Sequence, residues 1–259
     1  MLDFRPLASS SSGCCYLLSG GGASAPLLID AGVRYPIIQQ GLYFQVTQLA
    51  GCLVSHAHGD HCAAWRSLAK AAVDIYASVE TWERLGEPSF SRQDDANLYR
   101  CAPVDRCSRG HVLKPGEERS IGDWRVMPFE VVHDQPGTLG FIVAGPNGGK
   151  LLYLTDSAYS PYRFAGLTHI AIEANWSSEL LRESHRSGSV HSDRYKRTVR
   201  THMSIGRVIE MLQANDLSQV EEIWLLHLSD ENSDEAEFKK LVQQATGKPV
   251  YVAAKDGVK

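Results

Sequence analysis

The chain has 259 residues, of which 43% are hydrophobic and 22% charged, with a net charge of −4. These proportions are typical of a soluble globular protein and exclude collagen-like, coiled-coil and disordered classes, as well as a globally basic nucleic-acid coat. No apolar run approaches the roughly 18 residues that span a bilayer, and no secretion signal is recognisable. We therefore expect a cytoplasmic protein without a membrane partner, folded as one domain over residues 1–259, with its 6 cysteines reduced.

The predicted strands are short apolar runs rich in β-branched residues. In chain order they are Cys15–Leu18, Leu27–Asp30, Gly51–Ser55, Val73–Ala77, Trp124–Val132, Gly140–Ala144, Leu151–Thr155, His169–Glu173, Glu222–Leu226 and Pro249–Ala253. Helical patterns lie between them at Asp60–Ala72, Ser178–Glu183, Met203–Ala214 and Ser233–Ala245. This order of elements favours an α/β fold in which two sheets pack together with helices outside, although periodicity alone does not separate it from other α/β arrangements.

Two loop regions stand out between these elements. The serine run Ser9–Ser12, followed by Gly13, predicts a turn, and within it Ser11 is a candidate contact for a ligand. The polar stretch Glu87–Arg109 predicts a surface insertion. Within it, Cys101 and Cys107 form, with His111, an incomplete set of ligands for a structural zinc ion, and we regard this site as the weaker interpretation.

The segment His56-Ala57-His58-Gly59-Asp60-His61 carries the strongest chemical signal in the chain. It follows a predicted strand and opens a predicted helix. Alternate residues past a strand end project to the same side, so His56 and His58 can hold one metal ion. Asp60 and His61 lie on the following turn and can reach a second. Neutral imidazole and carboxylate groups are ligands for Zn²⁺, with Mn²⁺ and Fe²⁺ as alternatives.

The pattern His-x-His-x-Asp-His after a strand resembles the signature of the metallo-β-lactamase superfamily, and four further motif residues follow that family's order at strand ends. The resemblance implies an αββα four-layer sandwich and two divalent ions, Zn²⁺ or Mn²⁺. Two such ions, roughly 3.5–4 Å apart, hold and activate a bridging hydroxide. The implied ligands are His56, His58 and His133 for one ion, Asp60, His61 and His227 for the other and Asp156 for both, with Asp30 supporting the metal loop.

Three further segments resemble the YycJ-type (WalJ) branch of the superfamily, whose members are regarded as DNA exonucleases. They are Ser9–Tyr16, Glu173–Asn175 and Leu226–Asn232. A fourth segment, Arg200–Ser204, lies where tRNase Z-like phosphodiesterases carry a substrate-facing histidine, which here is His202. The chain departs from the branch at Ser10, Cys14, Ser177 and Arg200-Thr201, so the resemblance is that of a distant member.

Basic residues gather in the stretch from Arg182 to Arg207, which holds seven lysines and arginines against two acidic residues. Such a concentration predicts a rim that binds phosphates, and we expect the segment 182–200 to be mobile. Trp176 and Tyr195 are candidates for stacking on bases, although a solvated basic loop with core aromatics stays open. The candidate substrate contacts are Ser11, Asn175, Arg194, Lys196, Arg197 and Arg200.

Together these features predict a dinuclear metal-dependent phosphodiesterase, most simply a nuclease that acts on DNA rather than RNA as an exonuclease. Asp60 would orient a metal-bridged hydroxide, and His202 would protonate the leaving oxygen. Two enzymatic alternatives remain open: hydrolysis of small phosphodiesters such as cyclic nucleotides or short oligonucleotides, and a tRNase Z-like RNase. A metal-binding scaffold without catalysis is opposed by the complete ligand set, and a homodimer is neither required nor excluded.

Overall fold

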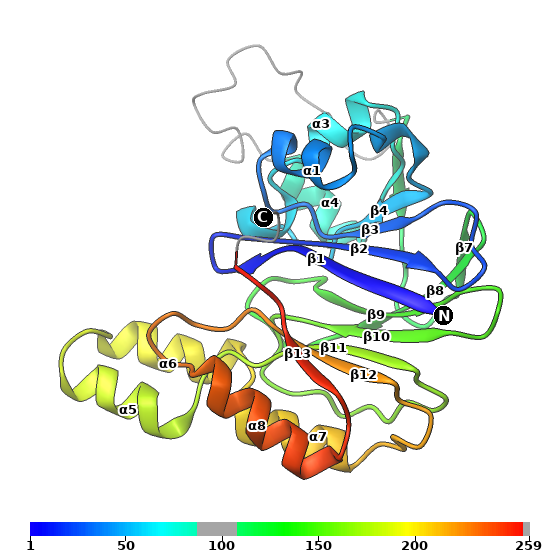
Figure 1. The fold of residues 1–259 in the computed structure, drawn as a ribbon. Helices are drawn as coiled ribbons and strands as arrows, with labels where there is room; N and C mark the ends of the chain where they lie inside the picture. The colour runs from blue at the N-terminus through cyan, green and yellow to red at the C-terminus, as the bar shows by residue number, and fades with distance from the viewer. Residues whose placement is uncertain (87–107, 256–259) are drawn as a thin grey trace.

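Two β-sheets lie face to face in the computed structural model, which describes residues 1–86 and 108–255 (Figure 1). The first sheet has the strand order β1 (Leu2–Ser10), β2 (Gly13–Gly20), β3 (Leu27–Ile29), β4 (Gly51–Leu53), β5 (Ile75–Ala77) and β6 (Gly110–Val112). The second has the order β13 (Val250–Val252), β12 (Glu222–Leu226), β11 (His169–Glu173), β10 (Lys150–Leu154), β9 (Leu139–Ala144), β8 (Trp124–Glu130) and β7 (Arg119–Ile121).

Helices cover the outer faces of both sheets, which gives the four layers of an αββα sandwich (Figure 1). The first sheet is covered by the short helices α1 (Tyr35–Gly41), α2 (Gly59–Cys62), α3 (Trp65–Lys70) and α4 (Val79–Leu85), with the 3-10 helix η1 (Val46–Gln48). The second is covered by α7 (Ile205–Gln213) and α8 (Glu235–Thr246), beside a hairpin of α5 (Ser178–Arg186) and α6 (Ser192–Thr201). In the part of the chain that the structure describes, no helix has the length and apolarity to span a membrane.

Strand alternation explains why both faces of each sheet are apolar. In β3, Leu27 and Ile29 point into the core between the sheets, whereas Leu28 packs under the helices. In β10, Tyr153 points inward and Leu152 faces α7 and α8. Because successive side chains point to opposite faces, a strand buried on both sides reads as a continuous apolar run.

The predicted α/β sandwich is confirmed, and every predicted strand lies on an observed one. Three short or edge strands, β1, β6 and β7, were not predicted. The edge strand β1 was missed because Pro6 interrupts its pattern, and the pairing register with β2 shifts between Pro6 and Ala8.

The single helix predicted over Asp60–Ala72 is wrong, because the chain breaks into α2 and α3. A neighbouring loop makes backbone hydrogen bonds with the chain at the break between α2 and α3. The carbonyl of His61 accepts from Ala31 N–H, and Ala64 N–H donates to the carbonyl of Ala31, both at 2.8 Å. Gly32 makes this approach possible, since a Cβ there would lie 1.6 Å from the carbonyl oxygen of Asp60.

The basic segment 182–200 is helical over most of its length, in the end of α5 and in α6. The sequence predicted only the first part of α5 and left α6 as a loop. Serine side chains cap the N-termini of α5 and α7. Ser177 accepts a hydrogen bond from Leu180 N–H, and Ser204 accepts one from Arg207 N–H. The mobility of this segment stays a prediction.

The strand directions bring the ends of six strands to one edge of the sandwich. Strands β3 and β4 are parallel in the first sheet, and β8, β10, β11 and β12 share one direction in the second. The residues just past three of these ends have left-handed backbones: Asp30 (φ 57°), Asp156 (φ 45°) and His227 (φ 51°). A left-handed backbone costs a non-glycine residue about 1–3 kcal/mol of conformational free energy, and such strained residues cluster at functional sites.

Candidate metal centre

The first predicted ligand set lies together at the edge of the sandwich. The ligand atoms of His56, His58, His133 and Asp156 all lie within 4.8 Å of one another. Nε2 of His56 is 2.9 Å from Nδ1 of His58, and Nε2 of His133 is 3.3 Å from the same atom. Carboxylate oxygen Oδ2 of Asp156 is 3.3 Å from His56 Nε2. Four donors converging on one point is the arrangement that a metal ion requires.

The second predicted set also meets at Asp156. Nε2 of His61 is 3.2 Å from Oδ2 of Asp156, and Oδ2 of Asp60 is 3.8 Å from His61 Nε2 and 3.7 Å from His227 Nε2. The buried thiol of Cys14 also lies within 4.8 Å of ring nitrogens of His61 and His227. Asp156 is therefore shared by the two clusters, as its assignment as a bridging residue requires.

Within the part of the chain that the structure describes, three buried atoms at this point have no hydrogen-bond partner: Nε2 of His61, Nε2 of His227 and Oδ1 of Asp156. Burying a polar atom without a hydrogen-bond partner costs about 1–3 kcal/mol of free energy. Three such atoms in one place therefore need a physical explanation. A divalent ion would satisfy all three atoms, since imidazole nitrogen and carboxylate oxygen are its usual ligands. The residues present thus fit the metal that the fold implies.

Burial keeps the histidines of the first cluster neutral. Burial, together with the charge of His61, lowers the pKa of His56 to about 3. The pKa values of His58 and His133 are also lowered, again by burial first. A neutral imidazole has a free lone pair for a metal ion, whereas an imidazolium does not. The electrostatic environment therefore prepares the ligand form of these rings.

Asp30 holds the metal loop from behind, as the sequence predicted. Its carboxylate is fully buried and accepts hydrogen bonds from Ser55 N–H (2.8 Å), Tyr153 O–H (2.6 Å) and Nδ1 of His61 (2.7 Å). In the neutral ring this bond to Nδ1 selects the tautomer in which Nε2 carries the lone pair that faces Asp156. A buried carboxylate commonly accepts the other ring N–H of a histidine that binds metal.

Glu173 is the site residue that the sequence did not single out. It ends β11, is fully buried, and its Oε1 lies 2.6 Å from Nδ1 of His202 and 3.0 Å from Nδ1 of His227. Its other oxygen accepts from Ser157 and Met203 N–H. The signal was present, because Glu173 follows an apolar strand in the same way as Asp156 and His227.

His202 lies at the cavity edge, held by Glu173. Burial opposes its charged form, but the neighbouring Glu173 carboxylate outweighs burial and raises the pKa of His202 above its usual value. Nδ1 of His202 is hydrogen-bonded to Oε1 of Glu173 and lies 3.6 Å from Oδ1 of Asp156. Among the described residues Nε2 of His202 has no hydrogen-bond partner, which leaves it available to a bound molecule.

A cavity of about 460 Å³, the metal-site cavity, opens over these groups. Of the candidate substrate contacts, Ser11, Asn175, Arg194 and Arg197 line it, whereas Lys196 and Arg200 are exposed and do not. Asn175 also has a structural task, since its Nδ2 donates to the carbonyl of His227 at 2.9 Å. The predicted basic rim is therefore only partly directed at the site.

Both rim arginines have carboxylate partners. Arg197 donates to Asp134 at 2.8 Å, and Arg194 lies 3.0 Å from Glu231. Asp134 also lies 3.1 Å from Nε2 of His133, so it links the rim to the metal cluster. Sequence reasoning missed Asp134, although it directly follows a motif histidine.

The aromatic candidates do not line the cavity. Trp176 is buried in the small core of the α5–α6 hairpin and donates to the carbonyl of His202 at 3.1 Å. Tyr195 packs against the same core and its ring lies 4.9 Å from that of His185. Base stacking by these two residues is therefore wrong, and the interpretation as core aromatics is right.

Only one member of the incomplete set of zinc ligands can be located in the structure. Cys101 and Cys107, like most of the predicted insertion at 87–109, lie outside the described residues. His111 is described, and it pairs with Asp74 at 3.5 Å and stacks on Tyr76 with ring centroids 4.6 Å apart.

Comparisons with known proteins agree with this architecture. The model of the beta-lactamase superfamily domain matches residues 26–228. The chain is 28% identical over 240 residues to "Exodeoxyribonuclease WalJ" of Streptococcus pneumoniae, covering 88% of this chain and 81% of that protein. It is also 28% identical over 246 residues to "Exodeoxyribonuclease YycJ" of Bacillus anthracis, covering 90% and 84%.

Solved structures share the whole fold. The metallo-beta-lactamase fold protein YhfI of Bacillus subtilis superposes with a TM-score of 0.68 at 15% identity, over 100% of this chain and 98% of that one. A diphosphatase of the PhnP family has a TM-score of 0.65 at 16% identity, over 100% and 96%. The resemblance seen in the motifs is thus confirmed: the chain belongs to the metallo-β-lactamase superfamily, as a distant member of its YycJ-type branch and a metal-dependent hydrolase.

Proposed function

We propose that this protein is a dinuclear metal-dependent phosphodiesterase that acts on DNA as an exonuclease. The observation that carries the proposal is the convergence of His56, His58 and His133 on Asp156, with unpartnered buried nitrogens on His61 and His227 beside it. The relatives that share most of their length with this chain are named exodeoxyribonucleases, which supports DNA as the polymer. Arginines at the rim of the cavity suit a polyanion.

His56, His58 and His133 would hold one ion and Asp60, His61 and His227 the other, with Asp156 shared. Bound divalent ions supply Lewis acidity and bring the pKa of bound water toward neutrality. Zn²⁺ and Mn²⁺ both accept this mixed set of imidazoles and carboxylates. The ligand arrangement is rigid, because Asp30 and Glu173 hold the histidine rings from behind.

The protein's own residues would position and protonate the substrate. The carboxylate of Asp60 faces the cavity and would orient the attacking water toward phosphorus. Nε2 of His202 would donate a proton to the leaving oxygen, while Glu173 holds the ring through Nδ1. The departing alcohol then leaves as a neutral hydroxyl.

Cleavage of an end-labelled panel tests the proposal. Duplex DNA, single-stranded DNA and RNA are each incubated with Mn²⁺ or Zn²⁺, with the His58→Ala variant as control. We expect DNA to be degraded from an end by the wild-type protein and to stay intact with the variant. The fragment ladder separates exonuclease from endonuclease cleavage.

The alternative activities give different results. Cleavage of RNA alone would favour a tRNase Z-like RNase. Polymers that stay intact while cyclic or short nucleotides are hydrolysed would replace the nuclease by a small-phosphodiester hydrolase. Failure on every phosphodiester by a metal-loaded protein would refute the proposal.

A further inference from the structure

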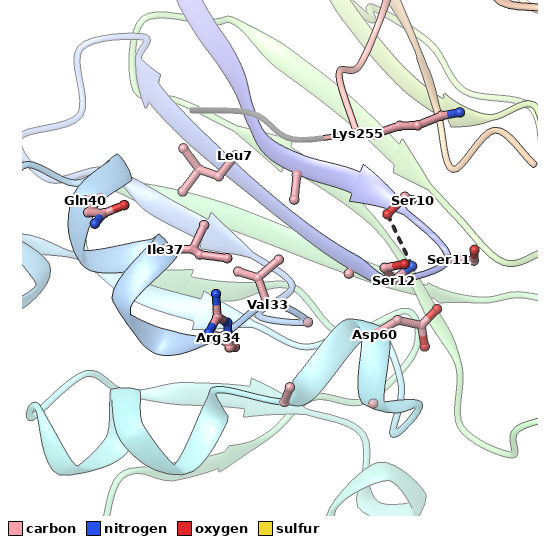
Figure 2. A pocket seen from close by; sticks show the side chains of 15 residues that line it. Leu7, Ser10, Ser11, Ser12, Val33, Arg34, Ile37, Gln40, Asp60 and Lys255 are labelled. Carbon is pink, nitrogen blue, oxygen red and sulfur yellow. Dashed lines mark hydrogen bonds between the residues drawn. The ribbon is translucent and has the colours of Figure 1, made fainter. Parts of the chain in front are cut away.

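A second cavity adjoins the metal-site cavity. Its volume is about 740 Å³, and it lies between β1, the turn Ser10–Ser12, α2 and the start of α1 (Figure 2). Ser11, Gly59 and Asp60 line both cavities. We call it the serine-turn cavity. Because the two share these residues, they adjoin at Asp60, one of the predicted metal ligands.

The serine-turn cavity has one apolar and one polar wall. The apolar wall is formed by Leu7 from β1, by Val33 just before α1 and by Ile37 within α1 (Figure 2). The hydroxyls of Ser10–Ser12 lie opposite, and Asp60 stands at the end toward the metal centre. Binding pockets of roughly 300–1,000 Å³ with mostly apolar walls and a few polar groups are typical for small ligands.

Arg34 brings to this cavity a positive charge that has no carboxylate partner among the described residues. Within residues 1–86 and 108–255, four lysine and arginine side chains line the two cavities, and three of them face carboxylates: Arg194 with Glu231, Arg197 with Asp134 and Lys255 with Asp230. The exposed side chain of Arg34 has no hydrogen bond or ion pair to any residue in 1–86 or 108–255. An exposed guanidinium without a carboxylate beside it is the better partner for a phosphate that arrives from solution.

Gly59 lies where the two cavities adjoin, and a Cβ at this position would meet no atom within 4 Å. The wall behind it is tight, since a Cβ on Gly32 would lie 1.6 Å from the carbonyl oxygen of Asp60. The surface beside Asp60 is therefore free of side-chain bulk at Gly59, while the loop Asp30–Gly32 packs closely against α2.

We propose that the serine-turn cavity binds the nucleotide next to the scissile phosphate of a single-stranded polynucleotide. Its sugar and base lie against Leu7, Val33 and Ile37, and the following phosphate pairs with Arg34. This inference rests on the proposed function, since it extends the substrate away from the metal centre. Arg194 and Arg197 then contact the strand on the other side of Asp60.

Variants of Arg34 test the subsite with two substrates. The variants are Arg34→Ala, Arg34→Glu and the conservative Arg34→Lys, and Arg125→Glu serves as the control, because Arg125 is exposed on β8 and lines neither cavity. The long substrate is a single-stranded DNA oligonucleotide. The short one is bis(p-nitrophenyl) phosphate, which has no second phosphate to pair with Arg34. Binding of a fluorescein-labelled oligonucleotide is measured in parallel by anisotropy.

We expect Arg34→Ala to lower kcat/KM for the oligonucleotide about tenfold at low salt and Arg34→Glu to lower it further, with Arg34→Lys in between. The dependence of log Kd on log salt should become less steep by about 0.7 in Arg34→Ala, as for one lost phosphate contact to a single strand. Hydrolysis of bis(p-nitrophenyl) phosphate by all three variants, and both readouts for Arg125→Glu, should stay within about twofold of the wild type.

Three results would overturn the subsite. These are wild-type affinity and turnover in both Arg34→Ala and Arg34→Glu, an equal loss on both substrates, or an equal loss in Arg125→Glu. The failure of the proposed function looks different: the wild type then hydrolyses neither substrate. In that case the anisotropy series alone decides whether Arg34 holds a polynucleotide.

Discussion

The metal cluster and the α5–α6 hairpin form two sides of one cavity but are built in opposite ways. In the cluster, His56, His61 and Asp156 are buried, and hydrogen bonds from behind fix each ring. On the hairpin, Arg194 and Arg197 are exposed and held by a single ion pair each. Buried and fixed groups suit bond cleavage, whereas exposed and exchangeable charges suit reversible contact with a long polyanion.

This difference predicts unequal consequences of mutation. If the proposed function holds, a change in the cluster should affect every substrate, because it alters the groups that would surround the reacting bond. A change on the hairpin affects only substrates long enough to reach it, and its effect falls with salt because the charges are exposed. The following predictions separate the two regions, from the largest effect to the smallest.

The largest effect should come from Asp156→Asn, which keeps the shape of the side chain that the two clusters share and removes its charge. We expect turnover of long and short phosphodiesters to fall about 1,000-fold, since lost metal stabilisation of several kcal/mol is worth that much. Metal content by mass spectrometry should fall in parallel. A variant that keeps full metal content and activity would show that Asp156 is no ligand.

His202→Ala should have the next largest effect, and the effect should depend on the leaving group. A general acid contributes typically 10²–10⁴-fold, so we expect a dinucleotide to be hydrolysed about 100-fold more slowly. A p-nitrophenyl ester, whose leaving group needs no proton, should lose less than about threefold. The control is His191→Ala, an exposed histidine at the start of α6. Equal losses on both esters would remove His202 from the acid role.

Asp30→Asn should weaken metal binding without touching the cavity. The carboxylate holds His61 from behind, and outer partners of this kind are typically worth 10–100-fold in metal affinity. Competition with a chromophoric chelator measures the change, and circular dichroism checks the fold. The exposed Asp123→Asn provides the matched substitution. Unchanged affinity in Asp30→Asn would mean that packing alone orients His61.

The smallest effects should separate Arg197 from its neighbour Lys196. Arg197 lines the cavity and Lys196 does not, although both lie on α6. We expect Arg197→Ala to raise KM for an oligonucleotide about fivefold at low salt and less at high salt. Lys196→Ala should change it by less than about twofold. Equal effects of the two changes would show that the hairpin attracts DNA by its net charge and not through directed contacts.

The predicted ligand residues were accessible from the sequence because each follows an apolar strand. Asp30, His133, Asp156 and His227 all lie within three residues of a strand end. Parallel strands deliver such residues to one edge, so local patterns were enough to bring the set together. Glu173 obeys the same rule and was overlooked, although the motif around it had been noticed.

The break between α2 and α3 could not be predicted from local sequence patterns. The local pattern over Asp60–Ala72 is helical, and the hydrogen bonds that end α2 come from Ala31, which lies thirty residues earlier in the chain. The sequence equally could not show which basic residues of α6 face the metal-site cavity. Their spacing alone does not distinguish Arg194 and Arg197, which line it, from Lys196 and Arg200, which do not. Long-range contacts decide such points, and single-residue patterns do not contain them.

By itself the sequence determined the order of the strands, the order of the ligand residues and the charge of the α5–α6 region, because apolar runs and strand-end motifs are local properties. The αββα class came from the family resemblance that those motifs carry. Only the tertiary structure decided that Glu173 joins His202 to His227, that Trp176 belongs to the core, and that Arg34 lines a cavity open to Asp60. Each of these depends on which elements pack side by side, and that is fixed by the burial of apolar faces over the whole chain.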